Sequence, residues 1–119
     1  MNEWPHPSPE IRRFADLIGP ERTLDLLENF AGQRIYVPRQ VVGDTTLATA
    51  LGVEAARIIS AEYGGDYLKV PIAREWRVLV YKSRRMSYRD IAKKVGCGED
   101  NVWRILNKNE ATQAQLTLF

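Results

Sequence analysis

The chain has 119 residues and a formal net charge of +2, with 45% hydrophobic and 27% charged residues. This composition is typical of a folded domain and excludes a chain that is disordered throughout. One cysteine and one histidine exclude a disulfide framework, a Cys/His zinc site and a Cys/His nucleophile pair. No paired carboxylates, metal-ligand spacing or phosphate-cradling glycine loop accompanies a candidate nucleophile, so we expect no metal, no cofactor and no enzyme.

No apolar run approaches the roughly 18 residues that a membrane-spanning helix needs. The first residues, MNEWP, lack the basic-then-apolar order of a signal peptide. We therefore expect a cytoplasmic protein that makes no membrane contact.

The first 73 residues contain a repeat. Residues 15–38, ADLIGPERTLDLLENFAGQRIYVP, align without gaps on residues 48–71, ATALGVEAARIISAEYGGDYLKVP, at an offset of 33 and with 6 identities in 24 positions. Each copy has helical spacing of apolar residues, then a break at glycine, then a short extended run that ends at proline. Each copy is therefore predicted to be a helix followed by a strand. The strand should be short, because the proline after it lacks the N–H that would continue a ladder.

Two such copies in about 70 residues can bury only a modest core. We expect a second chain to complete it, with strands pairing or leucine-rich helices packing across a two-fold axis. The alternative is a monomer whose two strands form a ribbon within the chain. Residues 1–73 are accordingly assigned to a dimerisation domain.

Positive charge is concentrated in residues 74–108, which hold 10 Lys/Arg against 4 Asp/Glu, whereas residues 1–73 hold 7 against 10. Such clustering is typical of nucleic-acid-binding modules, because neutralised phosphates release counterions. A solvated helix face is the alternative. Helices are predicted over 74–83, over 88–95 and from about 99 to about 108, with Ser87 as the N-cap of the second and Gly96 at its end.

The apolar, small and turn positions of residues 88–107 match a helix-turn-helix. These positions are Ile91, Ala92, Val95, Gly96, Cys97, Val102 and Ile105. A helical hairpin used only for packing is the alternative. If the second helix enters the major groove, the candidates for base contact are Asn101, Trp103, Arg104 and Asn107. The candidates for phosphate contact are Arg84, Arg85, Arg89, Lys93, Lys94 and Lys108.

In the order of these parts the chain resembles the Mor transcription activators of Mu-like phages and prophages, over roughly residues 12–108. The resemblance rests on LIGPERTLDLLENFAGQRIYVP, on GGDYLKVP and on the terminal MSYRDIAKKVGCGEDNVWRIL. It implies a mainly α fold with a short β-ribbon, in which a helix and strand dimerisation domain precedes a C-terminal helix-turn-helix over residues 74–108. It also implies an activator that binds an inverted repeat in double-stranded DNA as a homodimer and recruits the host RNA polymerase.

By the same resemblance, Tyr67 and Lys69 of the second strand are candidates for minor-groove contact, and core or ribbon pairing is the alternative for them. Gly98 departs from the family, which more often has a capping serine there. Asp100 stands where a neutral or basic residue is common. Both departures bear on the target sequence rather than on the fold, and a repressor with the same fold is a further alternative.

Residues 109–119 are predicted to be a flexible tail that ends in QLTLF. This pentapeptide resembles the motif with which bacterial polymerases and repair proteins dock on the sliding clamp. The candidate clamp-binding residues are Gln115, Leu116, Leu118 and Phe119. The alternative for this tail is packing on an apolar patch of its own dimer. The alternative to a transcription activator, from a different class of function, is a clamp-associated DNA-binding accessory protein.

Overall fold

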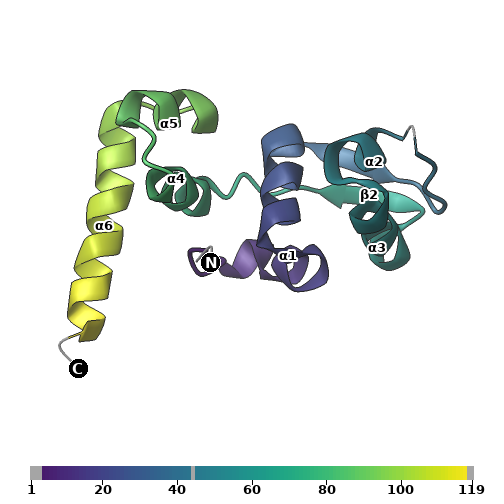
Figure 1. The fold of residues 1–119 in the computed structure, drawn as a ribbon, viewed down its shortest axis with the longest axis horizontal. Coiled ribbons are helices and arrows are strands. Elements are labelled where there is room, and N and C mark those ends of the chain that lie inside the picture. Colours follow the sequence, from purple (N-terminus) through teal and green to yellow (C-terminus); the bar gives the residue numbers. More distant parts are fainter. Residues whose placement is uncertain (1–3, 44, 118–119) are drawn as a thin grey trace. The chain divides into compact units, whose positions relative to one another are not determined.

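The computed structural model describes residues 4–43 and 45–117, with side chains described up to residue 110. Within these residues the chain is mainly helical, with six helices and one two-stranded antiparallel ribbon (Figure 1), which confirms the predicted fold class at this level. The elements are α1 (Pro9–Phe30), β1 (Arg34–Val37), α2 (Thr46–Leu51), α3 (Val53–Tyr63), β2 (Asp66–Lys69), α4 (Arg74–Ser83), α5 (Tyr88–Val95) and α6 (Glu99–Thr117). Among these described helices, none is long and apolar enough to cross a membrane.

The chain forms two compact units. Residues 7–73 make up the first, called here the repeat unit. The second, called the helical unit, contains the helices from residue 74 onward together with residues 4–6. Residues 4–6 are thus grouped with the helices from residue 74 onward, whereas the sequence-based division placed them with residues 1–73.

The sequence repeat is also a repeat of backbone conformation. Gly19, inside α1, and Gly52, between α2 and α3, are equivalent at the offset of 33. Their φ and ψ angles are 82° and 163° for Gly19, and 87° and 153° for Gly52. Because this region is open almost only to glycine, both copies bend at the same place. Each copy is thus a helix, a glycine bend, a second helix and a strand of 4 residues.

The two strands pair with each other in antiparallel orientation. Ile35 and Leu68, which are equivalent in the repeat, lie opposite each other. The register and the repeat are therefore both compatible with an internal two-fold axis through this pair. A partner chain is not needed to complete the ribbon, since the pairing takes place within one chain, as in the alternative that the sequence left open.

The core of the repeat unit draws on both copies. Val37 and Val70, each just before a proline and equivalent in the repeat, are both fully buried. Other buried side chains of the two copies are Leu24, Leu26, Leu27, Leu51 and Ile59, and Phe14 just before the first copy is also buried. Full burial of one such side chain stabilises a fold by roughly 1.5–3 kcal/mol before entropy is counted. The two copies together therefore supply the core that neither could form alone.

The helical unit is built around α4, whose buried residues are Trp76, Arg77, Val78, Val80 and Tyr81. Helices α5 and α6 pack on it and on each other. The bounds of α4 and α5 are those predicted from the sequence. Helix α6 differs, because it continues to Thr117 instead of ending near residue 108. Residues 109–117 include no glycine or proline and are rich in Ala, Gln and other helix formers, which fits the longer helix.

Candidate nucleic-acid interface

Helix α5 is capped at both ends, and a short turn joins it to α6. The Ser87 hydroxyl accepts the Asp90 N–H at 3.1 Å and so caps the start of α5. Gly96 ends α5 in the left-handed conformation (φ 72°, ψ 43°), and its N–H donates to the Ala92 carbonyl at 2.9 Å. The Gly98 carbonyl then accepts the N–H groups of Asn101 and Val102 in the first turn of α6, at 3.1 and 3.2 Å. The turn therefore has three residues and fixes where α6 begins.

Two arginines of α4 hold the end of α5. Arg77 Nη2 donates to the Lys94 carbonyl at 3.0 Å, and Arg74 Nε donates to the Val95 carbonyl at 3.3 Å. The last carbonyls of a helix lack partners within it and carry partial negative charge, which a guanidinium satisfies. Arg77 is only 6% exposed, so it serves as part of the scaffold. The sequence analysis did not identify Arg77. The signal in the sequence was an arginine placed between two apolar residues, Trp76 and Val78.

The face of α6 opposite the core carries polar and aromatic side chains. Val102 and Leu106 face inward and are 0% and 8% exposed. With 3.6 residues per turn, Arg104 and Asn107 project away from that buried side, and both are exposed. Trp103 lies on one flank and is 56% exposed. Of the predicted base-contact residues, the half-buried Asn101 lies closer to the core than the other three.

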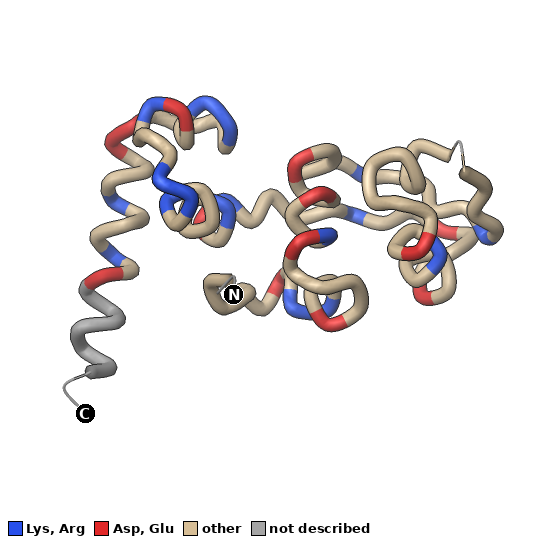
Figure 2. Tube along the Cα trace, viewed as in Figure 1, with Lys and Arg blue, Asp and Glu red and all other residues tan. Residues whose placement is uncertain are grey.

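The predicted phosphate-contact residues are all exposed, and most of them surround α5. Figure 2 shows the basic positions gathered on α4, on α5 and in the turn between them. The six residues are Arg84, Arg85, Arg89, Lys93, Lys94 and Lys108. Lys108 Nζ lies 3.4 Å from Glu75 Oε1 in an exposed ion pair. Exposed ion pairs of this kind contribute about 0–1 kcal/mol.

Arg85 has an unusual backbone conformation. It follows α4 with φ 62°, a left-handed value that glycine normally supplies at a helix end. The Arg85 N–H donates to the Lys82 carbonyl at 2.9 Å, and the Met86 N–H donates to the Tyr81 carbonyl at 3.2 Å. These are the two hydrogen bonds of a Schellman motif. A cation is thus held in the turn between α4 and α5 at a cost in backbone strain, a combination typical of functional sites.

The acidic start of α6 lies beside this basic surface. Glu99 and Asp100 are both exposed in its first turn. A Cβ atom added at Gly98 would lie 2.7 Å from a carboxylate oxygen of Asp100, so this side chain folds back over the glycine. A carboxylate is favourable at the positive end of a helix. The Asp100 carboxylate is thus placed at the end of α6 where negative charge is favourable.

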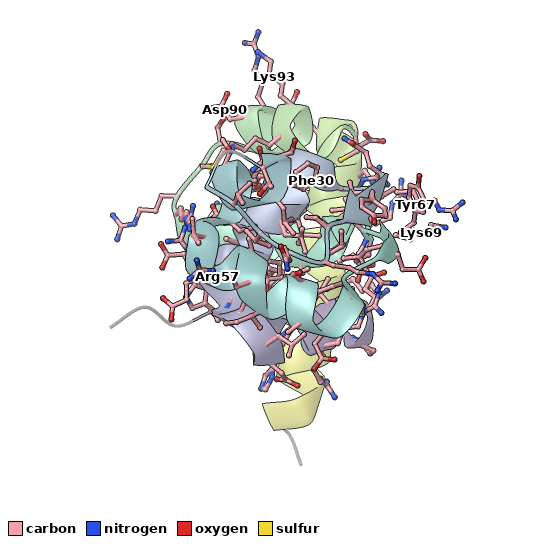
Figure 3. All side chains as sticks on the ribbon, turned by 90° about the vertical axis from the view of Figure 1, so that its right-hand side faces the viewer. Phe30, Arg57, Tyr67, Lys69, Asp90 and Lys93 are labelled. Carbon is pink, nitrogen blue, oxygen red and sulfur yellow. The ribbon has the colours of Figure 1, made fainter. Side chains whose placement is uncertain are left out.

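A second exposed basic and aromatic surface, called here the ribbon face, consists of Arg34, Tyr36, Tyr67 and Lys69. Arg34 lies opposite Lys69, and Tyr36 lies opposite Tyr67. The tyrosines are 54% and 58% exposed, with ring centroids 5.4 Å apart in an edge-to-face contact. Arg34 Cζ lies 5.0 Å from the Tyr67 centroid. Figure 3 shows Tyr67 and Lys69 projecting outward from the same side.

The sequence pointed only to Tyr67 and Lys69 on this face. Arg34 and Tyr36 were missed, although they occupy the same two positions in the first copy of the repeat. The internal strand pairing brings all four together. The clamp-binding candidates Gln115, Leu116, Leu118 and Phe119 lie outside the described side chains.

Comparison with known proteins finds no match for this chain among protein-family models, curated proteins or solved structures.

Proposed function

We propose that the chain is a sequence-specific DNA-binding transcription regulator in which α5 and α6 form a helix-turn-helix and α6 enters the major groove. The observation that carries the proposal is the exposed outer face of α6, bordered by a basic α5. Arg104 has the planar fork that matches O6 and N7 of guanine, and the Asn107 amide matches the edge of adenine. Trp103 adds a large apolar surface for a sugar or a thymine methyl group.

The surrounding cations support the same proposal. Arg84, Arg85 and Arg89 stand at the start of α5, and Lys93 and Lys94 at its end, so they bracket one helix with positive charge. Contacts of this kind fix the register of a protein on the duplex without reading its sequence. The net of +6 over residues 74–108, from 10 basic and 4 acidic residues, matches that role.

The ribbon face would provide a second contact, in the minor groove. Its two cations, Arg34 and Lys69, form one row of the ribbon, and its two tyrosines form the next. The resemblance to Mor activators supports the further proposals that two copies bind an inverted repeat and recruit the host RNA polymerase in the cytoplasm of a bacterium. Since each chain completes its own ribbon, the dimer would use other surfaces, such as the exposed Val53 and Ile58 of α3. A repressor would make the same DNA contacts at a binding site placed differently relative to the promoter.

Fluorescence anisotropy on labelled duplexes that carry a candidate dyad or a scrambled sequence tests this proposal. Arg104→Ala is expected to lose about 1–3 kcal/mol of the preference for the dyad while keeping the salt dependence of binding. Arg12→Ala, which removes an exposed arginine from α1, is the matched control and should behave as wild type. Equal affinity of the wild type for dyad and scrambled duplexes would contradict sequence-specific reading.

A second candidate function, a clamp-associated accessory protein, is favoured by one observation, the pentapeptide QLTLF at residues 115–119. In that case the helix-turn-helix would act as an anchor, and the clamp would raise the local concentration of the protein on DNA. Deletion of residues 115–119 separates the two functions. The regulator should keep promoter binding and activation, whereas the accessory protein should lose its function together with its binding to purified clamp.

A further inference from the structure

Residues 4–6 form a strap on α4. The Trp4 ring stacks on the Trp76 ring, with centroids 6.0 Å apart and 14° between the planes. Trp76 Nε1–H donates to the Pro5 carbonyl at 3.0 Å. Because Trp76 is only 2% exposed, this hydrogen bond and this stack fix the strap to the core of the helical unit.

Trp4 also contacts a cation of the candidate interface. Arg84 Cζ lies 5.5 Å from the centroid of the Trp4 ring, within the range of a cation–π interaction, for which tryptophan is the best ring. Trp4 is half-buried, whereas Arg84 is exposed in the turn before α5. One ring therefore connects a buried residue, Trp76, to a cation at the surface.

We propose that Trp4 is a positioning residue that holds Arg84 ready for a phosphate of bound DNA. This inference rests on the proposed DNA-binding function. A free arginine loses rotamer freedom when it contacts a phosphate, and a side chain already held in place loses less. The aromatic ring attracts the guanidinium without occupying its N–H groups, which stay available for phosphate oxygens.

A strap that only closes the core of the helical unit is the alternative role for Trp4. Two substitutions separate the roles. Trp4→Leu keeps apolar packing on Trp76 but removes the aromatic face, and Trp4→Tyr keeps an aromatic face. A core-closing role predicts that the two variants bind DNA alike once both are folded, whereas the positioning role predicts that only Trp4→Leu changes the contact made by Arg84.

The test is the salt dependence of duplex affinity for the intact chain and for Trp4→Leu, Trp4→Tyr, Arg84→Ala and the double variant Trp4→Leu/Arg84→Ala. Arg84→Ala should weaken duplex binding and reduce the slope of log K against log salt by about 1. Trp4→Leu should weaken binding by part of the Arg84→Ala loss while keeping the slope, because Arg84 still reaches the phosphate but loses more rotamer freedom when it does. Trp4→Tyr should keep the wild-type affinity. The double variant should match Arg84→Ala, because the two residues act through one contact.

A wild-type affinity for Trp4→Leu, or a loss of affinity that adds to that of Arg84→Ala, would overturn the positioning role and leave the proposed DNA binding intact. If the wild type binds no duplex, the proposed function fails and the positioning role fails with it. Should Trp4→Leu not fold, proton NMR of the wild type gives the decision. The Arg84 δ-methylene protons should show an upfield ring-current shift, and its absence would overturn the inference.

Discussion

At the scale of single residues, Arg85 combines a cost in stability with a candidate role in binding. Its φ of 62° disfavours any side chain with a Cβ atom. Arg85→Gly is therefore expected to raise the free energy of unfolding by about 1 kcal/mol, since glycine adopts this conformation freely. The same change should weaken duplex binding, because a phosphate contact is lost. Urea unfolding followed by circular dichroism and anisotropy on a duplex measure the two effects.

Arg85→Ala is the matched control for both measurements. It removes the charge but keeps a Cβ atom at the left-handed position, so its affinity should fall as far as that of Arg85→Gly. Its stability should stay within about 0.5 kcal/mol of the wild type, as for most surface substitutions. If the glycine variant were no more stable than the alanine variant, backbone strain at Arg85 would not be the cause.

At the scale of the elements, the caps determine where α5 lies. Ser87→Ala removes the hydroxyl that accepts the Asp90 N–H and should lower the free energy of unfolding of the helical unit by about 0.5–2 kcal/mol. Ser83→Ala is the control in the same unit, because the Ser83 hydroxyl only donates to a carbonyl of its own helix, that of Val80. Thermal unfolding of the two variants should differ, and equal melting temperatures would argue against the cap.

The same elements show what the sequence could predict. The bounds of α4 and α5 followed from apolar spacing and from local signals such as Ser87 and Gly96, which act within a few residues. The end of α6 was missed because no glycine or proline marks it. The partner of β1 could not be predicted, because a strand's sequence indicates which face is buried and leaves open which chain supplies the neighbour.

At the scale of the whole molecule, each of the two units has one feature that was not predicted from the sequence. The repeat was visible by alignment, yet the bend at Gly19 was missed, although the Gly19-Pro20 pair is a recognised turn signal. The strap was also hidden. Its hydrogen bond joins Trp76 to a carbonyl 71 residues earlier, and no periodic pattern in the sequence indicates a contact of that range.

The repeat itself makes the last prediction. Gly19→Ala and Gly52→Ala should each lower the free energy of unfolding of the repeat unit by about 1–3 kcal/mol, because both glycines have a conformation that alanine disfavours. Steric clash does not add to this cost. A Cβ atom at Gly19 meets nothing within 4 Å, and at Gly52 the nearest atom, on Arg22, lies at an ordinary 3.7 Å.

Gly43→Ala is the control, since Gly43 has no positive φ and a Cβ atom there meets nothing within 4 Å. Its effect should stay within about 0.5 kcal/mol. Amide hydrogen exchange in α1, α3 and the two strands measures all three variants. Similar losses for Gly19→Ala and Gly52→Ala would show that the two bends are energetically equivalent, as an internal two-fold requires. A large loss of stability for only one of the two variants would mean that the two bends have the same backbone conformation but contribute differently to the free energy of unfolding.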